Sequence, residues 1–196
     1  MSAVAKKRLN TDEYLAIENA AAFKSEFYDG EMFAMAGASP THNFIKDNLI
    51  RGLGNRLQSG RCRTASSDQR IRIERTGLFT YPDIVVVCGK PEISMRDPLA
   101  ILNPSVLIEI LSPSTEKYDR GTKLKQYRQI PGLKEYILVA QDEAHAERYF
   151  VQADGTWSLM DVVGLNANLE LAALGISVPL AEIYRDIEFP VPEETP

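Results

Sequence analysis

Three short apolar runs without polar alternation limit what this chain can fold into. They occupy residues 84–87, 105–111 and 135–140. A strand with one face in water alternates apolar and polar residues, whereas a central strand covered on both faces is apolar throughout. The runs therefore predict three central strands of a sheet that is covered on both faces.

The segments between these runs predict the covering helices. Thr41 can cap a helix that runs to about Gln58 and places apolar residues on one face, before a stop at Gly60. Residues 119–130 predict a second helix, which ends before a Pro-Gly pair, and residues 11–20 a short one capped by Thr11. Residues 67–75 alternate and predict a strand with Ile71 and Ile73 on one face.

Two hairpins are expected outside this central part. Asp29-Gly30 is a strong turn signal between residues 25–28 and 31–35, and Asp154-Gly155 divides residues 145–162 in the same way. Residues 89–104 predict a loop, and residues 169–183 have no clear pattern. The sequence thus predicts an α/β fold of core order αβββαβ, with one mixed central sheet flanked by helices. We expect one domain over residues 11–188, a flexible N-terminus over 1–10 and a disordered tail over 189–196.

Composition places the chain among ordinary globular proteins. No apolar run approaches the roughly 20 residues of a membrane-spanning helix, and no apolar stretch follows the basic residues near the N-terminus. Cys62 and Cys88 lack metal-ligand spacing and are too few for a disulfide scaffold, so we expect a reduced, cytoplasmic protein.

Charge is unevenly distributed along the chain. The net charge is −5, yet residues 51–75 hold seven arginines against two acids, and residues 117–134 hold six basic groups against one. Two basic segments on an acidic background are consistent with a phosphate-binding face. They are equally consistent with solvated helix and strand faces.

Glu109 is the most informative single residue, because every neighbour in the run Val106–Leu111 is apolar. A buried carboxylate has to be paired, protonated or bound to a cation. Asp83 stands at the mouth of the preceding strand, so the two carboxylates could share one hard cation such as Mg²⁺ with the carbonyl of Ile110. The alternative is structural: Asp83 would cap a turn, and Glu109 would pair with a buried base.

The helix predicted after Asp119 offers a cation for this pair. Lys123 and Tyr127 lie on one face at i and i+4 with Gln126 beside them, whereas Lys125 points elsewhere. We expect Lys123 to face Glu109 and to act on the attacking water or the phosphate charge. The alternative for Lys123 is an ordinary solvated lysine.

These patterns resemble the PD-(D/E)xK nuclease superfamily and, more narrowly, a widespread bacterial family of restriction-endonuclease-like proteins. The resemblance covers roughly residues 11–150. It is carried by the residues 81–87, 103–115 and 135–139, by Asp119, Lys123 and Tyr127, and by Glu26–Glu31 with His42. In the superfamily the motif's aspartate and glutamate bind metal, and they match Asp83 and Glu109.

The resemblance also includes departures from the superfamily pattern. The motif's lysine should stand two residues after the glutamate, where this chain has Leu111. The narrower family shares this departure, and its lysine has moved to the following helix, which matches Lys123. The first core helix often supplies an acid but here offers only Asp47, so Glu31 on the neighbouring hairpin is a candidate substitute, with His42 as a further accessory residue.

The resemblance implies an endonuclease that hydrolyses DNA with Mg²⁺ or Mn²⁺, in which a homodimer could cut both strands. We expect nucleic-acid contacts from Arg70, Arg72 and Lys125. Two alternatives stay open: a nuclease fold that binds nucleic acid without cutting it, and an oligomeric scaffold that keeps the carboxylates as remnants.

Overall fold

The computed structural model describes residues 8–58 and 60–190, and its centre is a mixed six-stranded sheet in the order β11-β10-β9-β8-β6-β3. Only β8 and β9 run parallel; their other neighbours are antiparallel. The strands are β3 (Cys62–Ser66), β6 (Ile84–Cys88), β8 (Val106–Ile110), β9 (Glu135–Val139), β10 (His145–Val151) and β11 (Trp157–Val163). The three apolar runs are β6, β8 and β9, so the prediction of three central strands is confirmed.

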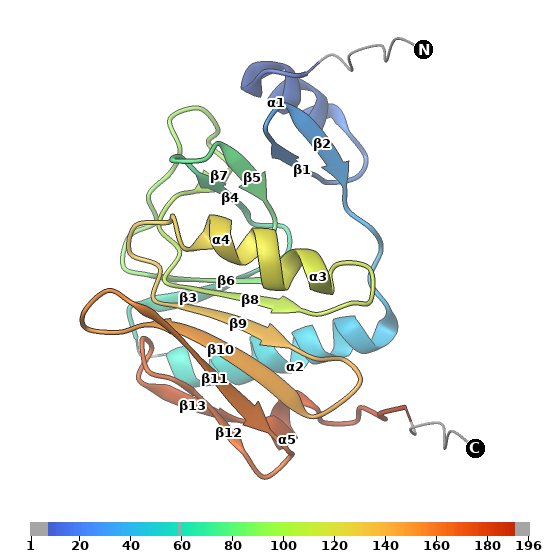
Figure 1. The fold of residues 1–196 in the computed structure, drawn as a ribbon, viewed down its shortest axis with the longest axis vertical. Helices are drawn as coiled ribbons and strands as arrows, with labels where there is room; N and C mark the ends of the chain where they lie inside the picture. Colours follow the sequence, from blue (N-terminus) through green and yellow to red (C-terminus); the bar gives the residue numbers. More distant parts are fainter. Residues whose placement is uncertain (1–7, 59, 191–196) are drawn as a thin grey trace.

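Helices cover both faces of this sheet, which explains why its central strands are apolar throughout (Figure 1). Helix α2 (Pro40–Leu57) packs Ile45, Leu49 and Leu53 against one face. The other face carries a helical segment made of α3 (Glu116–Tyr118), the π-helical turn η1 (Asp119–Lys123) and α4 (Leu124–Tyr127). The core order αβββαβ is present as α2, β3, β6, β8, α3–α4 and β9.

The predicted mixed central sheet flanked by helices is confirmed, but a second sheet lies beside it, so the expectation of a single sheet is wrong. Its order is β2-β1-β5-β4-β7, with β1 (Ser25–Tyr28), β2 (Glu31–Ala34), β4 (Arg70–Ile73), β5 (Leu78–Thr80) and β7 (Ala100–Ile101). Helix α1 (Thr11–Ala20) packs on this sheet, where Tyr14 stacks on Phe27 with ring centroids 4.6 Å apart. The predicted strand 67–75 belongs here, because β5 pairs with both β1 and β4.

The first strand of the core order is β3, which the sequence pattern did not reveal. Its sequence Cys-Arg-Thr-Ala-Ser contains no large aliphatic residue. β3 is the edge strand of the main sheet, where fewer apolar side chains are needed than in a central strand. The predicted helix caps are also displaced: Asn10 rather than Thr11 caps α1, and Ser39 rather than Thr41 caps α2.

The C-terminal part, which had no clear pattern, forms β12 (Asn168–Leu171), β13 (Ile176–Pro179) and α5 (Leu180–Ile183). Leu180 and Ile183 join the core beneath α2. Among residues expected to be flexible or disordered, Leu9 bonds to the carbonyl of Gly30 and Phe189 packs on Tyr184. The expectations for residues 1–7 and 191–196 lie outside the described residues.

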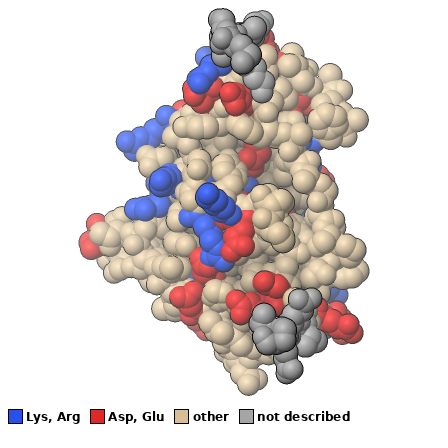
Figure 2. Space-filling view, turned by 45° about the vertical axis from the view of Figure 1, so that its right-hand side comes forward, with Lys and Arg blue, Asp and Glu red and all other residues tan. Residues whose placement is uncertain are grey.

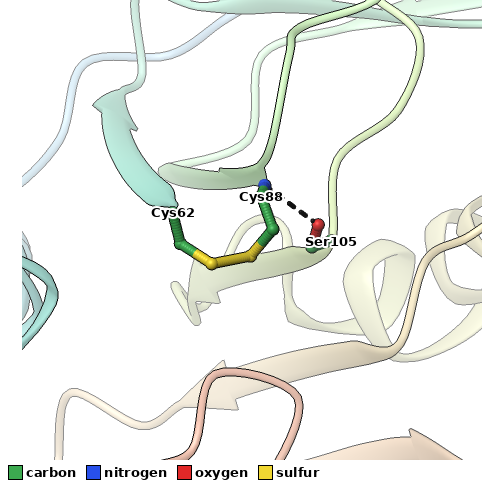
Figure 3. The surroundings of a disulfide bond; sticks show 3 residues. All are labelled: Cys62, Cys88 and Ser105. Carbon is green, nitrogen blue, oxygen red and sulfur yellow. Dashed lines mark hydrogen bonds between the residues drawn. A yellow bond between two sulfur atoms is a disulfide. The ribbon is translucent and has the colours of Figure 1, made fainter. Parts of the chain in front are cut away.

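Cys62 and Cys88 form a disulfide, so the expectation of reduced cysteines is wrong (Figure 3). The two residues are paired directly across β3 and β6, although 26 positions separate them in the chain. The amide of Cys88 also donates to Ser105 Oγ at 3.1 Å. Only the strand register brings the two sulfur atoms together.

Across residues 8–58 and 60–190, none of the helices has the length and apolar character needed to cross a membrane. The cytoplasmic location and the single domain over residues 11–188 stay predictions.

Candidate active site

Asp83 and Glu109 meet at one end of the main sheet. Asp83 immediately precedes β6, and the pairing of Ile84 with Ile108 places it beside Glu109 on β8. The amide of Asp83 donates to Glu109 Oε2 at 3.1 Å, and the amide of Ile110 donates to Asp83 Oδ2 at 2.9 Å. These bonds orient both carboxylates from the backbone of the two strands.

The helical segment supplies Lys123 and Tyr127 to the same carboxylate. Lys123 Nζ lies 2.9 Å from Glu109 Oε1, and the Tyr127 hydroxyl donates to that oxygen at 2.7 Å. Both side chains are buried, whereas Lys125 is exposed on the outer side of the helix. Gln126 is buried, and its Oε1 has no partner among the described residues. The prediction that the face with Lys123 and Tyr127 is turned toward Glu109 is therefore confirmed.

Two further carboxylates complete the cluster, and the sequence interpretation missed both as site residues. Glu26 on β1 lies 3.1 Å from Lys123 Nζ and accepts hydrogen bonds from the hydroxyls of Thr80 and Tyr118. Asp119, at the start of the π-helical turn, lies 3.6 Å from the same nitrogen. The structure thus places Glu26, not the candidate Glu31, against the centre.

Glu26 and Glu31 differ in their positions on the hairpin. Glu26 is buried, whereas Glu31 follows the turn of the hairpin and is only partly buried. In a strand, alternate residues point to opposite faces, so Glu26 and Phe27 cannot both face α1. Phe27 packs on Tyr14, which leaves Glu26 to face Lys123. A strand pattern of four residues is too short to show this from sequence.

His42 lies in the first turn of α2, where Ser39 caps the helix. Its Nε2 is 3.0 Å from Asp83 Oδ2, and its buried Nδ1 has no partner among the described residues. The structure therefore brings His42 into contact with Asp83, as an accessory residue would require.

Arg70 and Arg72 form their ion pairs with residues outside this cluster. Arg70 is buried and contacts Asp97 at 2.6 Å and the Tyr81 hydroxyl at 2.6 Å. Arg72 is partly buried and bonds to Ser94 at 3.1 Å. Because Arg70 is buried, the prediction that it contacts a phosphate is wrong. We do not include either arginine in the nucleic-acid interface.

Burial is the largest single influence on the pKa values of the centre. It raises the pKa of Glu109 well above the usual range of a glutamate, although the nearby Lys123 acts in the opposite direction. At Lys123 burial acts to lower the pKa of the ammonium group, but the surrounding carboxylates together raise this pKa above its usual value, so the lysine stays charged. Burial also raises the pKa of Asp119. Three carboxylates face this ammonium group and Asp83 faces His42, so acidic side chains outnumber the one lysine of the centre.

These features fit a divalent cation held by oxygen ligands. Asp83 Oδ1 has no hydrogen bond among the described residues, so it is available to a ligand. The Ile110 amide points at Asp83. In an extended strand the amide and the carbonyl of one residue point to the same side, so the Ile110 carbonyl is also directed toward Asp83. Asp83, Glu109 and the Ile110 carbonyl would then supply an all-oxygen set, which suits Mg²⁺ or Mn²⁺. Among the described residues, no three side-chain ligands come close enough at this centre to hold a metal ion by themselves. A metal ion held by Asp83 and Glu109 would therefore take its third protein ligand from the Ile110 carbonyl.

The fold and the arrangement of these residues define a protein of the restriction-endonuclease-like class, in agreement with the resemblance to the PD-(D/E)xK superfamily. The family model described as "Uma2: Putative restriction endonuclease" matches residues 11–181, and the chain belongs to this family.

The chain is also similar to two uncharacterized proteins and to one protein of known structure. Two uncharacterized proteins of Synechocystis sp., slr1290 and sll1609, are 35% and 36% identical to this chain. The matches cover 93% of this chain and 94% of slr1290, and 87% of this chain and 96% of sll1609. A crystal structure from Anabaena variabilis, described as a putative nuclease belonging to DUF820, superposes with a TM-score of 0.72. That match covers 88% of this chain and 96% of the other at 16% identity, which shows a shared fold.

Proposed function

We propose that this protein is a metal-dependent endonuclease that hydrolyses phosphodiester bonds in DNA. The observation that carries the proposal is the meeting of Asp83, Glu109 and Lys123 at one end of the main sheet. Lys123 Nζ lies 2.9 Å from Glu109, which is in turn bonded to the amide of Asp83. Membership of the family described as "Putative restriction endonuclease" supports the same activity.

The proposed roles follow from what each group contacts. Asp83, Glu109 and the Ile110 carbonyl would hold Mg²⁺ or Mn²⁺, which when bound supplies Lewis-acid activation of water and phosphate. His42 and the Ile110 amide fix the orientation of Asp83 through its Oδ2. Lys123 keeps its proton and presents positive charge beside Glu109, where it can stabilise negative charge that develops on a phosphate.

DNA as the substrate rests on the family and on the surface charge. Figure 2 shows basic side chains gathered midway along one face of the molecule, with acidic side chains among and below them. Lys125 is exposed on the same helical segment that carries Lys123. A cation on the exposed side of this helix can contact the phosphate backbone of a nucleic acid that is bound beside it.

Supercoiled-plasmid nicking with Mg²⁺ and with Mn²⁺ tests the proposal. We expect Asp83→Asn, Glu109→Gln and Lys123→Met each to lower the nicking rate by at least about 100-fold. Lys117→Met is the matched control, because Lys117 is an exposed lysine on the same helical segment. Circular dichroism spectra should be unchanged in the control and in Asp83→Asn.

Retained nicking in both carboxylate variants would refute the proposed centre. DNA binding without nicking in either metal would instead assign the protein to the class of nuclease folds that bind nucleic acid without cutting. The homodimer stays a prediction. A high ratio of linear to nicked plasmid would support it, because two active sites can cut both strands.

A further inference from the structure

A second group of potential metal ligands lies on the β10–β11 hairpin, outside the centre described above. His145 and Glu147 are two positions apart on β10, and Asp161 pairs directly with Glu147 across β11. Residues two apart share a face of a strand, as do directly paired residues of neighbouring strands. One ligand atom from each residue lies within 4.8 Å of the other two. Residues 8–58 and 60–190 contain no other such trio.

The three side chains are oriented by neighbours in the manner of metal ligands. Glu143 lies 3.5 Å from His145 Nδ1, while His145 Nε2 lies 2.9 Å from Asp161 Oδ1. The Tyr149 hydroxyl donates to Glu147 Oε2 at 2.9 Å. Metal-binding histidines commonly have a carboxylate at the second ring nitrogen, and metal-binding carboxylates accept hydrogen bonds of this kind.

The charge of the hairpin also favours a cation. Two carboxylates directly opposed on one face of a strand pair repel each other. Arg120 contacts Glu147, but it also bonds to Glu116 at 2.8 Å, so it keeps a partner if Glu147 turns toward a metal. Glu147 is buried, so its carboxylate needs a positively charged partner, either Arg120 or a bound cation.

We infer that His145, Glu147 and Asp161 form a second cation site, specific for a first-row transition ion such as Zn²⁺. One imidazole nitrogen and two carboxylates match the ligands that zinc takes in proteins, and they leave a coordination position open. Mg²⁺ prefers oxygen ligands alone, so the two sites differ in the metal they select. The hairpin site is independent of the Asp83–Glu109 centre, because it uses different strands and different ligands.

The histidine content of the chain allows a direct test, since His42 and His145 are its only histidines. Long-range ¹H–¹⁵N spectra of chelator-treated full-length protein would follow both rings during titration with ZnCl₂, and a His145→Gln variant would assign the signals. We expect the Nε2 resonance of His145 to move to the range of a metal-bound nitrogen. A response confined to His42 would overturn the inference.

Zinc stoichiometry provides a second readout that does not depend on nuclease activity. In a Glu109→Gln background, calorimetry should detect about one zinc ion, and adding Asp161→Asn should weaken its binding at least about 10-fold. Asp154→Asn is the matched control, because Asp154 lies in the turn at the other end of the same hairpin. Equal zinc binding with and without Asp161→Asn would overturn the inference, even if plasmid nicking behaves as proposed.

Discussion

At the scale of single residues, the position of Lys123 is defined by three carboxylates. Its Nζ lies 2.9 Å from Glu109, 3.1 Å from Glu26 and 3.6 Å from Asp119, and the side chain is buried. A buried charge is tolerated only when its partners remain in place, because removing one leaves desolvated groups without compensation. Glu26 therefore stabilises the fold as well as the orientation of the lysine.

We expect Glu26→Ala to lower the free energy of unfolding by about 2–4 kcal/mol, because Thr80 and Tyr118 lose their acceptor and Lys123 loses one partner. Glu31→Ala, on the neighbouring strand of the same hairpin, should change it by no more than about 0.5 kcal/mol. Urea denaturation of both variants gives the comparison. Equal losses in the two proteins would contradict the assignment of Glu26 to the centre.

At the scale of elements, the edge strand β3 is attached to the main sheet by two kinds of contact. Five residue pairs join it to β6, and the Cys62–Cys88 disulfide crosslinks the end of this ladder (Figure 3). β3 has few apolar side chains to bury, so the crosslink adds a restraint where packing is weak. Because β6 begins next to Asp83, the strand that the crosslink restrains also positions the candidate centre.

A reductant should therefore destabilise the protein. Closing a loop of 26 residues by a disulfide stabilises a fold by about 3 kcal/mol, so reduction should lower the free energy of unfolding by that amount. Chemical denaturation with and without a phosphine reductant measures the change. A Cys62→Ser/Cys88→Ser double variant is the control and should be insensitive to the reductant. Equal stability of the wild-type protein in both conditions would argue against the crosslink.

At the scale of the whole molecule, fewer arginines face solvent than the sequence composition indicates. Arg70 pairs with Asp97 and Arg148 with Glu135, and both arginines are buried. Arg56 pairs with Glu182 at 2.8 Å. The basic surface available to a nucleic acid is therefore local, which is consistent with the net charge of −5.

Lys125 is the exposed basic residue that we expect to contact a phosphate. Lys125→Ala should weaken DNA binding and reduce the slope of log affinity against log salt by about 1, the change for one lost phosphate contact. Fluorescence anisotropy over a range of salt concentrations measures the slope. Lys90→Ala serves as the control, because Lys90 is exposed beyond the end of β6 that lies opposite Asp83. An equal effect of both variants would indicate nonspecific attraction.

Much of the central fold and part of the candidate centre could be predicted from local sequence patterns. The apolar runs predict β6, β8 and β9, because a strand covered on both faces needs apolar residues at every position. Glu109 stands out for the same reason, and the helical spacing of Lys123 and Tyr127 indicates the face that meets it. The position of Asp83 at the start of the neighbouring apolar strand adds a second carboxylate, and the resemblance to the family adds His42.

Tertiary structure decided the remaining features, each of which depends on contacts between distant segments. Strands β1, which carries Glu26, and β4, which carries Arg70, both pair with β5 and so form a second sheet. In this sheet Glu26 is buried beside Lys123, and Arg70 is buried beside Asp97. The strand register likewise joins Cys62 to Cys88. Local patterns report which side chains avoid water, whereas strand pairing is set by the packing energy of the complete chain, and no single segment contains that information.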